Sequence, residues 1–117
     1  MLTGRLVLVV EDEAMIAMLV EAALVEAGAK VALAASVDEA LELIGNRRLD
    51  LAVLDCKLGE EPVTPVADRL AGLGVPIIFA TGYGEDYDRG QHSNAPIFTK
   101  PFAPEELVHT IDNLLRR

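Results

Sequence analysis

The apolar residues of this chain fall into two alternating patterns, which predict that strands and helices alternate along it. Continuous apolar runs bounded by polar or turn residues are typical of strands that are buried on both faces of a sheet. Such runs extend over Leu6 to Val10, Val31 to Ala34, Leu49 to Leu54, Pro76 to Ala80 and Ile97 to Thr99.

Apolar residues between these runs recur at helical spacing, which predicts amphipathic helices after the first, second, third and fifth runs. Gly28 stands where the first helix would stop, and Ser36 with Glu39 has the spacing of a capping box at the start of the second helix. Thr64 and Pro65 are read as the N-cap and first position of the third helix. The expected inward face of the first helix consists of Ile16, Leu19, Val20, Ala23 and Leu24.

The segment after the fourth run is different, because residues 84–94 carry no apolar stripe at helical spacing and have acids at positions 85, 86 and 88. A helix this short with little apolar face is marginal. We therefore predict that a fourth helix is short, displaced or mobile. His92 in this segment and His109 in the last helix are expected to be solvated.

Strict alternation of strand and helix predicts an α/β domain with a mainly parallel sheet and helices on both of its faces. The crossovers should be right-handed. Residues 1–117 are long enough for one such domain and are expected to carry no output domain. In sheets of this kind the binding site lies beyond the carboxyl ends of the strands.

The charge of the chain narrows the choice of partners, because ten basic and nineteen acidic residues give a net charge of −9. Such a field repels phosphate-rich molecules, so a nucleic-acid partner is not expected. No apolar run reaches membrane-spanning length, so no membrane partner is expected either. The single cysteine, Cys56, fits a reducing cytoplasm, and it is expected to be a small buried apolar residue.

Polar residues follow four of the predicted strands. Glu11 and Asp12 come after the first strand, Asp55 after the third, Thr81 after the fourth and Lys100 after the fifth. Three carboxylates brought together repel one another, so a cation must compensate them. Mg²⁺ suits carboxylate oxygens, and the ammonium of Lys100 can serve when no metal is bound.

Asp55 is the candidate nucleophile of this arrangement, since a carboxylate can attack phosphorus and form an acyl phosphate. Thr81 and Lys100 would then stabilise oxygens of the transferring group. An aspartate-based phosphatase of the haloacid-dehalogenase type is an alternative, but it needs a second aspartate where this chain has Lys57. A further alternative is a binding module that keeps the fold and works without phosphorylation.

Four motifs in order make the chain similar to the receiver domains of two-component response regulators. They are Val9-Val10-Glu11-Asp12-Glu13, Leu54-Asp55, Ala80-Thr81-Gly82 and Lys100-Pro101-Phe102. The resemblance covers essentially the whole chain and implies a flavodoxin-like fold with strand order 2-1-3-4-5.

The resemblance also implies a role for each matching position. Asp55 would be the phosphoacceptor, while Asp12, Asp55 and the backbone carbonyl of Lys57 would ligate Mg²⁺ and Glu11 would reach it through water. Thr81 and Lys100 would sense the phosphoryl group, and the Lys100–Pro101 bond would be cis. Such a domain is not an enzyme for a separate substrate, because it catalyses only its own phosphorylation and dephosphorylation.

The string Phe79-Ala80-Thr81-Gly82-Tyr83-Gly84 resembles the FATGUY-type subgroup of receivers, which is mostly alphaproteobacterial. Many members stand alone and are served by kinases of the HWE or a related class. The implied partner is a sensor histidine kinase or a histidine phosphotransfer protein, and the output is a protein contact or a phosphate sink. The resemblance leaves open whether the domain is a monomer or a weak dimer.

Two positions depart from the usual pattern of the family. Ile97 stands where receivers carry an aromatic residue that moves together with the threonine, and alternation along the strand places Phe98 on the opposite face. The residues after Asp55 also lack the common proline-glycine turn. Because of Ile97, the usual threonine-to-aromatic coupling is not expected to work in this chain as it does in other receivers.

Overall fold

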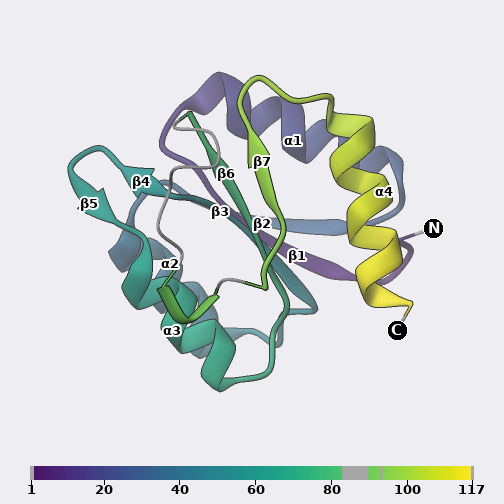
Figure 1. Cartoon of the computed structure of the whole chain (residues 1–117). Coiled ribbons are helices and arrows are strands. Elements are labelled where there is room, and N and C mark those ends of the chain that lie inside the picture. Colours follow the sequence, from purple (N-terminus) through teal and green to yellow (C-terminus); the bar gives the residue numbers. More distant parts are fainter. Residues whose placement is uncertain (1, 83–89, 93, 117) are drawn as a thin grey trace.

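A five-stranded parallel sheet forms the centre of the molecule (Figure 1). The structure is a computed structural model that describes residues 2–82, 90–92 and 94–116. The strands of the sheet are β1 (Leu6–Val10), β2 (Lys30–Ala34), β3 (Leu51–Asp55), β6 (Ile77–Thr81) and β7 (Ile97–Thr99). Their spatial order is β2-β1-β3-β6-β7, so the predicted flavodoxin-like order 2-1-3-4-5 is confirmed when only the strands of this sheet are counted.

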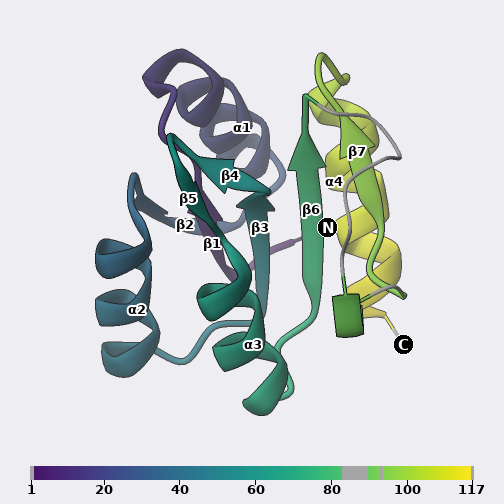
Figure 2. The same cartoon turned by 60° about the vertical axis from the view of Figure 1, so that its left-hand side comes forward.

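Helices cover both faces of the sheet and divide the core into two apolar clusters (Figure 2). On one face, α2 (Val37–Asn46) and α3 (Thr64–Gly72) pack with the cluster that contains Phe79. On the other face, α1 (Ala14–Glu26) and α4 (Pro104–Leu115) pack with the cluster that contains Ile78. Successive strand residues point to opposite faces, so a run that is apolar at every position serves both clusters.

Two of the predicted helix boundaries rest on specific contacts. Ser36 Oγ accepts a hydrogen bond from the Glu39 amide at 3.1 Å, and Glu39 Oε1 accepts one from the Ala35 amide at 2.7 Å. The capping box therefore forms at the start of α2, with its return bond one residue earlier than usual. Gly28 has a φ of 101°, which a residue with a side chain rarely adopts, and its amide donates to the Val25 carbonyl.

Two details of the predicted helices were wrong. Thr64 lies inside α3, and the N-cap is Val63, whose side chain makes no capping hydrogen bond. Leu19 does not face the core, because it is 60% exposed, whereas Val20 and Leu24 are buried as predicted. The apolar content of α1 is so high that the sequence pattern does not separate its buried face from its exposed one.

A small hairpin that sequence analysis missed follows Asp55. It consists of the antiparallel strands β4 (Lys57–Leu58) and β5 (Glu61–Pro62), and it projects from the body of the domain at the left of Figure 1. Gly59 begins its two-residue loop with a φ of 61°, the left-handed conformation that such a loop needs at its first position. The residues after Asp55, which lack the common proline-glycine turn, therefore form a short β-hairpin.

The prediction for residues 84–94 lies largely outside the described residues. Within this range the structure describes residues 90–92 and 94, and Gly90–His92 form a 3₁₀ turn. In the described part of the chain, no helix has the length and apolar character that crossing a membrane requires.

Candidate functional site

Main-chain hydrogen bonds beyond the strands bring the predicted site residues to one edge of the sheet. The amide of Glu11 donates to the Ala34 carbonyl at 2.9 Å, and the amide of Cys56 donates to the Ala80 carbonyl at 3.0 Å. The Lys100 amide donates to the carbonyl of Thr81 at 2.8 Å. These bonds continue the sheet ladders, so the side chains that follow each strand are held by the backbone and not by flexible loops.

Carboxylates at the carboxyl ends of β1 and β3 form the acidic cluster of the site, which consists of Glu11 and Asp12, directly after β1, and Asp55, the last residue of β3. One oxygen of each residue lies within 4.8 Å of one oxygen of each of the others. Glu11 and Asp55 are 6% and 8% exposed, whereas Asp12 is open to solvent. The predicted convergence of these residues is therefore confirmed.

Lys100 neutralises part of this cluster. Its Nζ atom lies 2.7 Å from Oε1 of Glu11 and 3.3 Å from Oδ2 of Asp55. The other oxygen of Glu11 accepts a hydrogen bond from the amide of Glu13 at 3.2 Å. The ammonium of Lys100 is therefore held by two carboxylates at the carboxyl edge of the sheet.

The protonation equilibria of the pair reflect this burial. Burial raises the pKa of Glu11 above its ordinary value of 4.5, and the hydrogen bond from Lys100 opposes that rise. Burial works against the charge of Lys100, but the hydrogen bond to Glu11 and the negative charges of Asp55 and Glu11 outweigh it and raise its pKa above 10.5. The lysine is therefore a permanent cation at neutral pH.

The donor set of the acidic cluster fits a hard divalent cation. Mg²⁺ takes oxygen ligands at about 2.1 Å, so two ligand oxygens of one ion lie at most about 4.2 Å apart. The carboxylate oxygens of the cluster lie within 4.8 Å of one another, so a small movement of these side chains lets them bind one ion. Lys57 pairs with Pro62 across the β4–β5 hairpin, and Pro62 has no N–H to donate. The residue opposite Lys57 therefore donates no backbone hydrogen bond to the Lys57 carbonyl, which the resemblance implies as a further metal ligand.

Thr81 is the last residue of β6, at the same edge of the sheet as Asp55, and it is fully buried. It pairs with Thr99 of β7, and two residues earlier Phe79 pairs with Ile97. Ile97 packs against the cluster on the α2 and α3 face, and Phe98 packs against the cluster on the opposite face. The predicted opposite orientation of Ile97 and Phe98 is confirmed.

Three further expectations can be compared with the structure. The Lys100–Pro101 bond is cis, Cys56 is buried and His109 is exposed, as predicted. Tyr83 lies outside the described residues.

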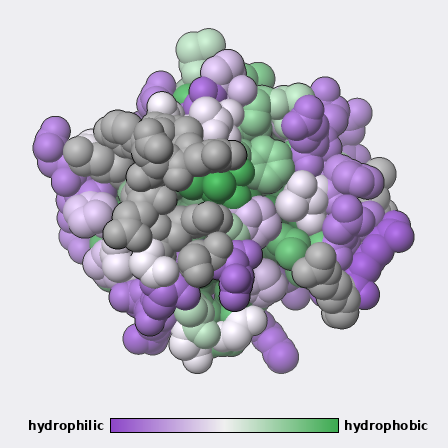
Figure 3. Space-filling model, viewed as in Figure 1, coloured by the Kyte–Doolittle hydropathy of each residue, from purple (hydrophilic) through white to green (hydrophobic). Residues whose placement is uncertain are grey.

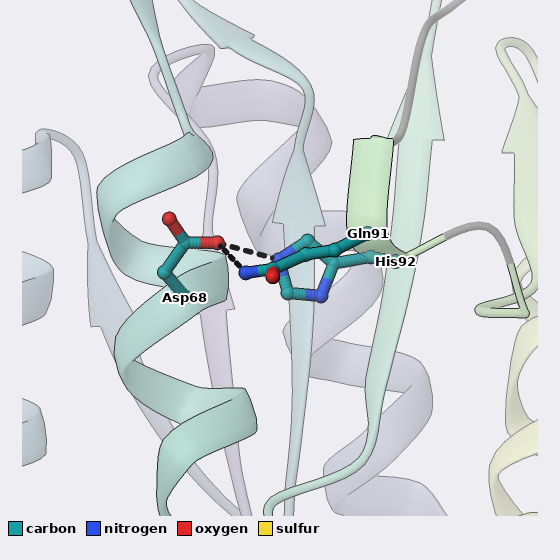
Figure 4. Close-up of polar contacts among 3 residues, drawn as sticks. All are labelled: Asp68, Gln91 and His92. Atoms are coloured by element: carbon teal, nitrogen blue, oxygen red, sulfur yellow. Dashed lines mark hydrogen bonds and ion pairs between the residues drawn. The ribbon is translucent and has the colours of Figure 1, made fainter.

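Sequence analysis was wrong about His92. Its side chain is only 9% exposed, and its Nε2 atom lies 2.7 Å from Oδ1 of Asp68 on α3 (Figure 4). The ring also packs against the ring of Phe79, with 6.2 Å between the centroids. The polar residues around His92 in the sequence gave no signal of this burial, because both of its partners come from elements far away in the chain.

Known proteins resemble this chain in sequence and in fold. Residues 7–112 match the family model described as the response regulator receiver domain. The transcriptional regulatory protein DltR of Streptococcus agalactiae is 40% identical over 109 residues, which cover 89% of this chain and 49% of that protein. The chain spans about half the length of the curated relatives it matches.

Solved structures agree with the family match. The receiver domain of the TMAO respiratory system response regulator TorR superposes with a TM-score of 0.86 at 30% identity, covering 97% of this chain and 98% of that chain. The response regulator TrrA of Thermotoga maritima, solved in complex with Mg²⁺ and BeF, superposes with a TM-score of 0.83 at 26% identity, covering 94% and 98%. The fold, the acidic cluster with its lysine and the matched residues lead to one conclusion: this chain belongs to the response regulator receiver domain family.

Proposed function

We propose that the chain accepts a phosphoryl group on Asp55 from a histidine kinase or a phosphotransfer protein, in a reaction that depends on Mg²⁺. The observation that carries this proposal is the acidic cluster with Lys100 on two of its carboxylates. Such an arrangement concentrates negative charge beside an ammonium that can move to a new anion. It suits a site where a phosphoryl group is received and held.

Asp55 is the attacking group in this reaction. One of its carboxylate oxygens forms a bond to phosphorus while the bond from phosphorus to the donor's imidazole nitrogen breaks. The imidazole keeps the electron pair of the broken bond and becomes neutral with a proton from solvent. Asp55 lies at the end of a strand that is buried along its whole length, so its position is fixed before the donor arrives.

Thr81 and Lys100 stabilise the product. The ammonium of Lys100 already lies 3.3 Å from Asp55 and needs only a short movement to meet a phosphoryl oxygen. The Lys100 amide donates a hydrogen bond to the Thr81 carbonyl, so a movement of one residue is transmitted to the other. A hydroxyl and an ammonium at these positions can each bind one phosphoryl oxygen.

Glu11, Asp12, Asp55 and the backbone carbonyl of Lys57 would hold the metal, with Glu11 acting through water. Bound Mg²⁺ would neutralise oxygens of the transferring group. Glu11 also holds Lys100 at 2.7 Å, so it positions the lysine as well as the ion. The two cations divide the charge of the cluster between them, which lets three carboxylates remain ionised.

The exposed apolar face of α1 is the proposed contact surface for the phosphodonor. Met15, Met18 and Leu19 are exposed on this helix. A hollow of about 460 Å³ adjoins it and contains Lys100 in its wall; its lining is Glu13, Ile16, Leu19, Val20, Gly82, Lys100, Pro101, Phe102 and Pro104. On the side seen in Figure 3, green apolar surface runs from the top towards the centre, while the α4 side is hydrophilic. An apolar surface next to the site edge suits a helical partner that delivers a phosphoryl group.

The remaining features of the proposal follow the resemblance to the FATGUY-type subgroup. The donor would be a kinase of the HWE or a related class, and the domain would act in the cytoplasm as a stand-alone receiver. Its output would be a protein contact or removal of phosphoryl groups from a shared kinase, with no separate substrate to turn over. Neither a nucleic acid nor a membrane is a direct partner in this proposal.

The proposal is tested by incubating the purified chain with Mg²⁺ and acetyl phosphate and measuring its intact mass. We expect one added phosphoryl group in the wild type and none in Asp55→Asn or after chelation of the metal. Phosphorylation of Asp55→Asn to the same extent would contradict the assignment of the acceptor. A wild type that stays unmodified, and that also fails to respond to beryllofluoride, would favour the phosphorylation-independent binding module.

A further inference from the structure

Asp68 on α3 receives two hydrogen bonds from the 3₁₀ turn on a single carboxylate oxygen (Figure 4). Nε2 of His92 and Nε2 of Gln91 both lie 2.7 Å from Oδ1 of Asp68. An ionised carboxylate can only accept, so both nitrogens donate to it. We call Asp68, Gln91 and His92 the α3 clamp, because they tie the chain between β6 and β7 to α3.

The two ends of the clamp differ in their surroundings. The side chain of His92 is 9% exposed, whereas that of Asp68 is 47% exposed. The buried His92 ring packs on Phe79 of β6 at an interplanar angle of 55°. His92 therefore contacts the sheet with one part of its ring and the solvent-facing carboxylate of α3 with another.

Phe79 connects the clamp to the phosphoryl site. It lies two residues before Thr81 on β6, so both side chains are on the same face of the sheet. The clamp thus joins the 3₁₀ turn Gly90–His92 to α3, which is the first helix after Asp55 in the chain. A displacement of the end of β6 would change the support beneath the His92 ring.

We propose that the α3 clamp holds β6 in its resting position and opens when a phosphoryl group on Asp55 draws Thr81 inward. His92 is then a positioning residue for the site, acting through Phe79. The inference rests on the phosphoacceptor function proposed above. The clamp is the contact through which phosphorylation of Asp55 would change the structure on the α3 side of the domain.

The clamp has the properties of a contact that can open. Its acceptor is 47% exposed, so water can compete with both donors for the carboxylate of Asp68. A hollow of about 280 Å³ has His92 in its lining, together with Ile77 and Leu114, and gives the ring room to move. None of the other residues that line this hollow is ionisable, and Asp68 approaches the ring from α3.

The hydrogen bond from His92 lowers the pKa of Asp68 below its ordinary value of 3.8, with a smaller contribution from Gln91. This agrees with the geometry, since both side chains favour the ionised form of the acceptor. At neutral pH the carboxylate of Asp68 is therefore ready to accept both bonds.

Thermodynamic reciprocity provides the test. If loading of Asp55 opens the clamp, a variant with a weakened clamp must bind a phosphoryl mimic more tightly. Mg²⁺ with beryllofluoride is titrated into the isotopically labelled full chain, and amide signals of Thr81 and Lys100 report the affinity. Asp68→Asn removes the charge of the acceptor, and His92→Phe keeps the ring but removes its donor. Glu42→Gln is the matched control, because it neutralises an exposed carboxylate on the neighbouring helix α2.

We expect Asp68→Asn and His92→Phe to bind the mimic about fivefold more tightly or better, which is the lower end of common coupling between sites. Glu42→Gln should bind as the wild type does. In the wild type, the ring signals of His92 should shift on binding, and this measurement needs no substitution.

Two results would overturn the inference in different ways. If Thr81 and Lys100 respond while the His92 ring signals stay fixed and both clamp variants keep the wild-type affinity, the clamp has no role in the site. If the wild-type site itself does not respond to Mg²⁺ and beryllofluoride, the phosphoacceptor function fails and the inference falls with it.

Discussion

The Nζ atom of Lys100 lies 2.7 Å from Oε1 of Glu11, so an ion pair forms inside the acidic cluster. The ammonium lies beside the same carboxylates that would attract a divalent cation. Lys100 and a bound metal ion therefore compete in part for the same negative charge. Removing the lysine and removing a carboxylate should consequently change the stability of the metal-free chain in opposite directions.

Replacement of Lys100 by methionine should lower the stability of the metal-free chain, because Glu11 and Asp55 lose their cation. The expected loss is about 1–3 kcal/mol, the range for a buried polar group that is left without its partner. The hydrogen bond from Lys100 opposes the rise of the Glu11 pKa, so this pKa should rise further in the variant. Urea unfolding with and without Mg²⁺ checks this: the metal should stabilise Lys100→Met more than it stabilises the wild type.

Replacement of Asp12 by asparagine should have the reverse effect on the metal-free chain. Asp12 is the exposed member of the cluster, and its loss relieves repulsion with the two buried carboxylates. We expect a gain on the order of 1 kcal/mol, reduced by salt, together with a large loss of Mg²⁺ affinity. Thermal unfolding over a range of Mg²⁺ concentrations is the measurement. If the metal raised the Tm of Asp12→Asn as much as that of the wild type, Asp12 would not be a metal ligand.

Met18 tests the proposed contact surface on α1. Its side chain is exposed, so Met18→Glu should fold normally, but it places a charge on an apolar surface. We expect phosphotransfer from a histidine kinase to slow at least about tenfold more than phosphorylation by acetyl phosphate, since about 1.4 kcal/mol of lost contact energy suffices. The ratio of the two rates is the measurement, and equal slowing of both reactions would place the defect at the site itself.

Asp68 gives a prediction in acid. Its pKa is lowered in the folded state by the hydrogen bond from His92, so its contribution to stability is present above the ordinary value of 3.8. That contribution is lost as the pH falls through the folded-state pKa. A carbon-detected NMR titration should place the carboxyl pKa of Asp68 below the ordinary value in the wild type. In His92→Phe it should move back towards 3.8, and an unchanged value would contradict the hydrogen bond.

The sheet and its site edge could be predicted because each depends on a simple local pattern. The five apolar runs identify the strands, and parallel strands carry the residues that follow them to one edge, so Asp55, Thr81 and Lys100 were placed together correctly. The sheet order came from the family resemblance. Periodicity alone does not determine which buried strands are neighbours.

Other features have no local pattern to reveal them. The β4–β5 hairpin has two residues in each strand, too few for an alternation of apolar and polar positions to be recognised. His92 lies in a polar stretch, and its burial depends on Asp68 being brought near it by the packing of α3. The exposure of Leu19 reflects an excess of apolar residues on α1, where composition hides the boundary between core and surface.

The sheet separates the two apolar clusters, with Ile97 on one side and Phe98 on the other. Substitutions in separate clusters that share no partner should have additive effects on the free energy of unfolding. The α1 side, which bears the proposed donor contact, can therefore accumulate changes in sequence without disturbing the packing under α2 and α3. A chain built in this way can change its upstream partner and its response surface as two independent evolutionary events.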